Sequence, residues 1–155
     1  MRLTTQTDYA LRVLMHAALM DGELDRIDNV AADFGISRNH LSKVVHNLSA
    51  SGYLQTVQGR NGGFRLAHDP VNISVGQVVR DFEPDFNLVE CFDSATSQCA
   101  IQKNCVLAGA FDGALTAFLD RLDQVSLKDL IRPRRKLTLQ LGLTGRPVTR
   151  LAAGR

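Results

Sequence analysis

Apolar residues in the first 20 positions recur at intervals of three and four, which is the period of an α-helix. Thr7 is a suitable N-cap for this helix, and the Asp-Gly pair at 21–22 is a suitable end. The same period returns over 29–34 and again from Ser37 to about Gly52. The chain is therefore predicted to begin with three helices.

The second and third predicted helices are separated by a tight turn at Gly35, where a residue without a Cβ adopts the left-handed conformation at little cost. Asp28 and Ser37 are the expected N-caps of these two helices. Two short helices joined in this way are typical of a helix-turn-helix unit, whose second helix enters the major groove of DNA.

The third helix has an apolar stripe that would pack inward, which leaves a polar face exposed. Side chains on that face could donate to phosphates and to base edges. They are Arg38, Asn39, His40, Ser42, Lys43, His46 and Asn47. A solvated surface helix has the same pattern, so this helix considered alone does not establish DNA binding.

A predicted β-hairpin follows the third helix directly. Segments 53–58 and 64–67 alternate apolar and polar residues and flank a glycine-rich turn at 59–63. The tip consists of Arg60, Asn61 and Gly62. Such a hairpin is the wing of a winged helix, and glycines let its backbone approach a phosphate or the minor groove. We expect a mainly α fold with a small β wing, with residues 1–83 as a winged helix-turn-helix DNA-binding domain.

One short and one long helix are predicted after the wing. Ser74 is the expected N-cap of the short helix, which Pro84 stops, and the helical period returns over 106–124. Ser126 is expected to cap a final turn over 127–131, so that residues 106–131 comprise the long helix and this turn. One edge of the long helix carries Leu107, Phe111, Ala114, Phe118, Leu122 and Val125. This edge could cover the winged domain. Because so small a domain has little need of so long a helix, a dimer interface is the favoured interpretation.

Charge is distributed unevenly although the formal net charge is only +2. Residues 34–68 contain four bases and no acid, whereas residues 71–105 contain five acids and two bases. Residues 132–155 contain seven bases and no acid, and we expect a flexible basic tail there. A basic region beside an acidic one fits a nucleic-acid-binding protein with a separate sensing part.

All three cysteines, Cys91, Cys99 and Cys105, lie in a polar segment at 84–105 that we expect to form a loop. Thiolates bind zinc, copper(I) or iron-sulfur clusters, but the close C-x(2)-C pair usual for zinc is absent from the sequence. Three thiolates leave one metal position for an oxygen or nitrogen ligand. Buried free thiols, or one disulfide with a spare thiol, are the alternatives.

Neither an apolar leader nor a run long enough to span a bilayer is present in the sequence, so we expect a cytoplasmic protein, in which thiols stay reduced. An enzyme with an activated cysteine is disfavoured, because no histidine lies near a cysteine in sequence and neither a nucleophile elbow nor a phosphate-binding glycine loop is present. A zinc-binding adaptor without a DNA role stays a further alternative.

The chain up to about Ile131 resembles a family of small dimeric bacterial winged-helix regulators that carry an iron-sulfur cluster. The segments that carry the resemblance are the opening Met1-Arg-Leu-Thr-Thr-Gln-Thr-Asp-Tyr-Ala-Leu-Arg, Ser37-Arg-Asn-His-Leu-Ser-Lys, Gly59-Arg-Asn-Gly-Gly, Ile73-Ser-Val-Gly-Gln-Val-Val-Arg and the three cysteines. The resemblance implies a homodimeric repressor that binds a palindromic double-stranded operator. It also implies one 4Fe-4S cluster per subunit, held by Cys91, Cys99 and Cys105.

Members of that family differ in the fourth cluster ligand. Regulators of iron-sulfur biogenesis have a histidine soon after the third cysteine, whereas this chain has no histidine beyond His68. Nitric-oxide sensors have an aspartate near the start of the first helix, donated from the partner subunit, and Asp8 matches it. An acid in a first helical turn is also common for electrostatic reasons alone. The resemblance therefore favours nitric-oxide sensing, with iron sensing as the alternative.

Overall fold

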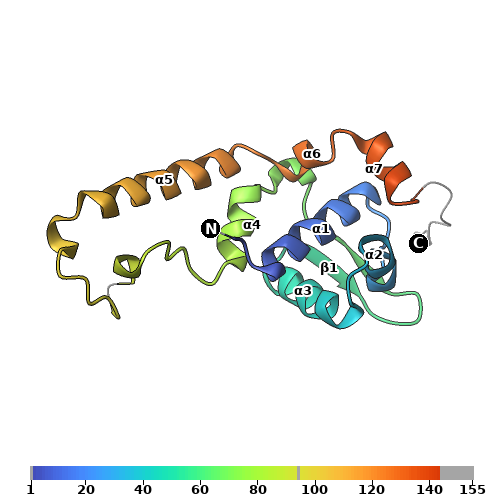
Figure 1. Ribbon diagram of the computed structural model, residues 1–155. Coiled ribbons are helices and arrows are strands. Elements are labelled where there is room, and N and C mark those ends of the chain that lie inside the picture. Colours follow the sequence, from blue (N-terminus) through green and yellow to red (C-terminus); the bar gives the residue numbers. More distant parts are fainter. Residues whose placement is uncertain (1, 94, 144–155) are drawn as a thin grey trace.

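The structure is a computed structural model that describes residues 2–93 and 95–143. It is mainly helical with one two-stranded sheet (Figure 1). In chain order the helices and strands are α1 Thr5–Leu19, α2 Ile27–Phe34, α3 Arg38–Ala50, β1 Leu54–Val57, β2 Gly63–Leu66, α4 Val75–Phe82, α5 Val106–Asp123, α6 Leu127–Leu130 and α7 Arg134–Gln140. The expected mainly α fold with a small β wing is confirmed.

Helix α1 lies at the centre of the domain and packs against α3, α4, α6 and strand β2. Its residues Val13 and Leu14 are fully buried, as are Leu41 and Leu48 on the inner face of α3. Each side chain of this size contributes about 1.5 to 3 kcal/mol when it is removed from water. The apolar stripe predicted for the third helix is therefore the face that packs on α1, and the polar face is left outside.

Strands β1 and β2 form an antiparallel hairpin in which Leu54 pairs with Leu66 and Val57 pairs with Gly63. The hairpin is anchored by the connection between α1 and α2, because the backbones of Asp25 and Phe64 exchange two hydrogen bonds of 2.8 and 2.9 Å. Phe64 is 2% exposed, so its ring joins the core and fixes the base of the wing.

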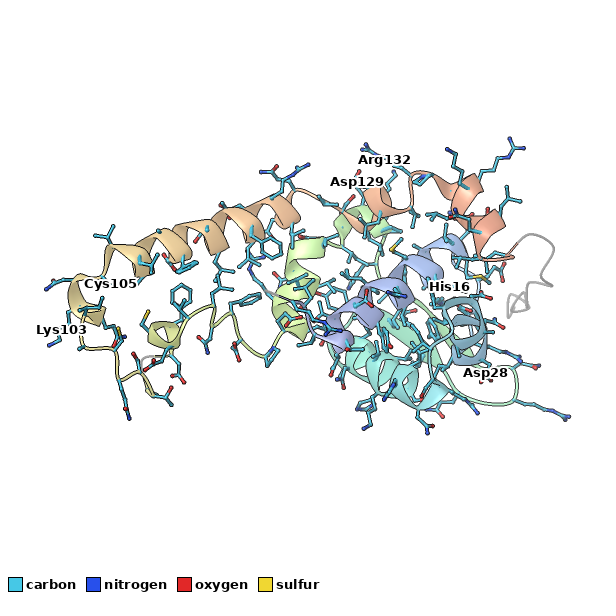
Figure 2. All side chains as sticks on the ribbon, in the orientation of Figure 1. His16, Asp28, Lys103, Cys105, Asp129 and Arg132 are labelled. Atoms are coloured by element: carbon cyan, nitrogen blue, oxygen red, sulfur yellow. The ribbon has the colours of Figure 1, made fainter. Side chains whose placement is uncertain are left out.

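His16 on α1, labelled in Figure 2, is fully buried. Its ring lies between two carboxylates. Its Nδ1 is 2.5 Å from Asp25 and its Nε2 is 2.7 Å from Asp33 on α2. Burial by itself lowers the pKa of His16, but the hydrogen bonds and charges of the two carboxylates outweigh it and raise the pKa. The two carboxylates thus favour the protonated imidazole, and His16 joins α1, α2 and the base of the wing.

Helix α5 extends from the domain as an arm, and none of its residues is buried in the single chain (Figure 1). Its C-terminal end is tied to α4 and to the segment before it. Asp123 forms an ion pair with Arg80 of α4 at 2.5 Å, and the amide of Val75 donates to the carbonyl of Val125 at 2.9 Å. The cysteine segment lies at the opposite, N-terminal end of this arm.

Two expected N-caps differ in the structure. The cap of α1 is Thr4 instead of Thr7, and its hydroxyl accepts a hydrogen bond from the Thr7 amide. Helix α2 begins at Ile27, so Asp28 lies in its first turn, and no side chain caps it. Sequence periodicity does not fix helix ends to better than a turn. The caps Ser37, Ser74 and Ser126 are confirmed, and so is the left-handed Gly35.

The expectation of a flexible tail from residue 132 onward is wrong for residues 134–140, which form α7. Leu137, Leu141 and Leu143 pack against the core. The guanidinium of Arg134 donates to the carbonyls of Ala18 and Leu19 at the end of α1, at 3.4 and 2.9 Å. A cation is favourable at that end of a helix. The rest of the predicted tail, residues 144–155, lies outside the described residues.

Candidate functional site

The polar face of α3 is open to solvent along its whole length. Arg38, Asn39, His40, Ser42, Lys43 and His46 are exposed, and Asn47 is half-buried. The side chain of Ser42 is already engaged, because its hydroxyl donates to the carbonyl of Arg38 at 2.9 Å. The remaining donors have no such restriction within the helix, so this face can meet a major groove as the sequence predicted.

A groove of about 500 Å³ lies between α2, α3 and the wing. Arg26, Arg38 and Arg60 line it, together with backbone of the wing. Gly62 is required there, since a Cβ at this position would lie 2.2 Å from the carbonyl oxygen of Val57. The fold thus collects three arginines, distant in sequence, around one concave surface, as expected for a phosphate-binding face.

Arg38 is not free in this groove. Its Nε is 3.0 Å from Oδ1 of Asp28 on α2, in an ion pair between two exposed side chains. The sequence suggested neither this pairing nor the position of Asp28 beside the DNA-facing residues, because Asp28 was expected to act only as a helix cap.

The three cysteines line one cavity of about 200 Å³ between their loop and the start of α5. All three are free thiols and are half-buried. Much of the remaining wall is apolar and includes Val89, Ile101, Leu107 and Phe111. The segment looked polar in sequence, but several apolar residues line the same cavity as the cysteines. One cavity lined by all three cysteines favours a common ligand over a disulfide or three unconnected core thiols.

Hydrogen bonds hold the cysteine loop in place. The amide of Gln98 donates to Glu90 at 2.7 Å, and the side-chain amide of Gln102 donates to the carbonyl of Cys91 at 3.1 Å. The hydroxyl of Thr96 donates to Asp93 at 2.7 Å and lowers the pKa of that carboxyl group. The loop is therefore built around the cavity by local side-chain contacts, before any ligand is considered.

The donor set of this cavity fits an iron-sulfur cluster better than a single metal ion. Within residues 2–93 and 95–143, no three His, Cys, Asp or Glu side chains are close enough together to hold one ion. A tetrahedral zinc ion would need its ligands within about 2.3 Å of one point. Three cysteines distributed around a largely apolar cavity suit a larger cluster, to which thiolates are the usual ligands.

Asp8 does not take part in the cavity of its own chain. It lies in the first turn of α1, where Arg12 binds it with N–O distances of 2.8 and 3.2 Å. No residue of α1 lines the cysteine cavity. Asp8 and the cysteine cavity are thus separate within one chain, and the ligand role that the resemblance implied for Asp8 stays a prediction.

A helix-turn-helix with an exposed second helix, followed directly by a hairpin, defines a winged-helix DNA-binding protein. The chain belongs to the Rrf2 family, whose model is described as an iron-dependent transcriptional regulator and matches residues 3–133. It is accordingly a transcriptional regulator and not an enzyme. None of the helices in the described part of the chain is long and apolar enough to cross a bilayer.

Known relatives agree with this assignment. The chain is 47% identical over 133 residues to the HTH-type transcriptional regulator NsrR of Bacillus subtilis, covering 85% of this chain and 91% of the relative. The oxidized form of Staphylococcus aureus CymR matches with a TM-score of 0.67 and 25% identity, over 85% and 97% of the two chains. T. potens IscR has a TM-score of 0.68 at 19% identity, over 88% and 90%, which supports the fold alone.

Other residues with structural roles near these sites were not apparent from the sequence. Glu83, at the start of the segment that leads to the cysteines, accepts hydrogen bonds from the amide and hydroxyl of Thr4 at 2.8 and 3.1 Å. This contact connects that segment to the beginning of α1 across 79 residues of chain. A pattern along one chain cannot reveal such a pair, because neither residue is unusual at its position.

Proposed function

We propose that the protein is a homodimeric repressor that carries one 4Fe-4S cluster per subunit and releases its operator when nitric oxide destroys the cluster. The observation that carries the proposal is the convergence of Cys91, Cys99 and Cys105 on one cavity at the end of an arm. That cavity is separate from the groove between α2, α3 and the wing, which supports a sensing site distinct from the DNA-binding site.

DNA binding is assigned to α3 and the wing. In the dimer, the two α3 helices would enter successive major grooves of a palindromic site, about one helical turn apart. Arg38, Asn39, His40, Ser42 and Lys43 would face the groove, and Arg60, Asn61 and Gly62 would approach the backbone or the minor groove. The exposure of these residues and the arginine-lined groove support this assignment.

The dimer interface is assigned to α5. The predicted apolar edge of this helix is open in the single chain, where Leu107 is 62% exposed and no residue of the helix is buried. An apolar edge of this length that meets its symmetry mate would form a two-fold interface. The same pairing would bring the cysteine cavity of one subunit towards the other subunit.

Cys91, Cys99 and Cys105 would hold the cluster, with Asp8 of the partner subunit as the fourth ligand. The bound cluster would supply the iron at which nitric oxide reacts. A carboxylate is a hard ligand for this soft centre, so it should be the weakest of the four attachments. Ligation would take Asp8 away from Arg12, and loss of the cluster would let that ion pair form again.

Two contacts of this chain would pass the change to the DNA-binding domain. Thr4 and Glu83 tie the start of α1 to the segment before the cysteines, while Arg80 and Asp123 tie the arm to α4. Loss of the inter-subunit attachment would change the spacing between the two α3 helices. A hundredfold loss of operator affinity requires a difference of only about 2.7 kcal/mol between the two states.

The test is an anaerobic titration of the coloured protein with nitric oxide. Visible absorbance and binding to a duplex selected from a random-sequence pool should fall together. Cys99→Ala should lack the chromophore and specific DNA binding but remain dimeric, while Gln98→Ala, an exposed neighbour in the same loop, should keep both. Binding that persists after the absorbance is lost would refute cluster control.

Iron sensing is the second candidate. It is favoured by the description of the family model, which names an iron-dependent transcriptional regulator. Iron chelation and nitric oxide can be compared on the same preparation. Under the first proposal, a stoichiometric amount of nitric oxide releases the DNA faster than chelation does, and the reverse order would favour iron sensing.

A further inference from the structure

We infer that Asp28 is a positioning residue for DNA recognition, which orients the Arg38 guanidinium so that its two terminal nitrogens can read a base edge. The inference rests on the proposed DNA-binding function and adds a determinant of its specificity. The observation behind it is the ion pair between Arg38 Nε and Asp28 Oδ1, with an N–O distance of 3.0 Å.

The geometry of the guanidinium gives the pair its significance. Arginine has five N–H donors in a rigid planar fork, and the most common specific contact in the major groove is a bidentate one to guanine O6 and N7. In this ion pair the carboxylate of Asp28 lies at Nε, which leaves the Nη1 and Nη2 end of Arg38 for such a contact. A carboxylate on the Nη side would have competed with the base.

The two residues are held by different helices of the helix-turn-helix. Arg38 is the first residue of α3, where base contacts of this motif usually originate, and Asp28 lies in the first turn of α2 (Figure 2). Both positions are on rigid elements packed around a shared core. The contact therefore restricts a long side chain that would otherwise sample many rotamers when it is 68% exposed.

The location of Asp28 is otherwise difficult to explain. It lines the groove that also contains Arg26, Arg38 and Arg60, where a phosphate is expected. A carboxylate in that position repels DNA phosphates, so its presence there suggests a compensating role within the protein. The α2 dipole favours a negative charge in this turn but does not require one, whereas only a carboxylate at this point can form an ion pair with Nε of Arg38.

The experiment compares Asp28→Asn with the wild type on two duplexes of equal length. One is selected by the wild-type protein from a random-sequence pool, and the other is a shuffled version of it. We expect Asp28→Asn to bind the selected duplex about 3- to 10-fold more weakly. This loss is smaller than the full discrimination of one bidentate contact, because Arg38 itself is still present. Binding to the shuffled duplex should stay unchanged or tighten, because a negative charge is removed.

Equal tightening on both duplexes would mean that Asp28 only repels phosphates, and no change on either would mean that it has no role; both results overturn the inference. Asp112→Asn on α5 is the control for the change in net charge, and it should leave the ratio of the two affinities unaltered. In an Arg38→Ala background, Asp28→Asn should have no further effect on that ratio. An additive loss there also overturns the inference.

The same experiment separates the inference from the function on which it rests. If the cluster-loaded wild-type protein selects no sequence from the pool, the proposed operator recognition fails before any variant is compared. If it selects a sequence and Asp28→Asn retains the full preference, only the role of Asp28 fails. Circular dichroism and thermal unfolding of the variant should match the wild type, because Asp28 is 67% exposed.

Discussion

Gly76 of α4 lies directly against Asp123 at the end of α5. A Cβ at residue 76 would be 2.0 Å from Oδ1 of Asp123 and 2.8 Å from its backbone nitrogen. One turn further along α4, Arg80 donates to both oxygens of the same carboxylate, at 2.5 and 2.8 Å, and lowers its pKa. These contacts set the angle at which the arm leaves the DNA-binding domain.

Gly76→Ala should therefore disturb the junction of α4 and α5. The backbone nitrogen of Asp123 cannot move aside as a side-chain tip can, so we expect a loss of about 1 to 3 kcal/mol in the free energy of unfolding. Gly113→Ala is the matched control, because its new Cβ would meet nothing within 4 Å. It should stabilise the helix by about 0.5 to 1 kcal/mol, and urea unfolding measures both.

His16→Gln should destabilise the domain by about 3 to 5 kcal/mol, because it removes the ring that contacts two buried or nearly buried carboxylates, Asp25 and Asp33. His68→Gln, an exposed histidine, should have little effect. Thermal and urea unfolding distinguish the two variants, and equal losses would contradict this role for His16.

The same histidine gives a pH dependence. The pKa of His16 in the folded state is raised above its ordinary value of 6.5, so its contribution to stability is complete below that pH. It is lost as the pH rises through the raised pKa. The free energy of unfolding of the wild type should accordingly fall relative to that of His16→Gln on the alkaline side of 6.5. Parallel pH profiles would show that folding does not shift the pKa of His16 and would contradict this assignment.

Asp8→Asn should weaken cluster retention if Asp8 is a ligand. Arg12→Gln is the informative comparison, since it removes the same ion pair but keeps the carboxylate. We expect only the Asp8 variant to lose its chromophore faster on exposure to nitric oxide or a chelator. Equal behaviour of the two variants would reduce the role of Asp8 to its pair with Arg12.

Arg60→Ala at the tip of the wing should weaken binding to selected and shuffled DNA by similar factors. A lost phosphate contact also reduces the slope of log affinity against log salt by about 1. Arg38→Ala should instead weaken binding mainly to the selected duplex. A sequence-dependent loss for Arg60→Ala would place a base contact in the wing.

Arg134→Ala should release α7 from the end of α1. The arginine loses two carbonyl acceptors there, and we expect a cost of about 1 kcal/mol together with faster amide exchange in residues 134–140. Arg135→Ala, an exposed neighbour on the same helix, should change neither quantity. Unaltered exchange in the Arg134 variant would assign the docking of α7 to its leucines alone.

The sequence by itself determined the order of the elements. Helical periods, the Gly35 turn, the caps Ser37, Ser74 and Ser126 and the glycine-rich hairpin are local signals, because each depends on residues within about one or two turns of one another. The exposed face of α3 followed from the same local rule, since an apolar stripe on one side of a helix leaves the other side to solvent.

Only the tertiary structure decided which distant residues meet. It joined the cysteines around an apolar cavity, placed Asp28 against Arg38 and Glu83 against Thr4, and enclosed His16 between two carboxylates. It also showed that part of the predicted tail forms α7. The leucines of this segment pack against the core, and Arg134 donates to the carbonyl of Leu19 at the end of α1. Such contacts depend on how whole elements pack, and the physical reason that sequence periodicity misses them is that it records only neighbours along the chain.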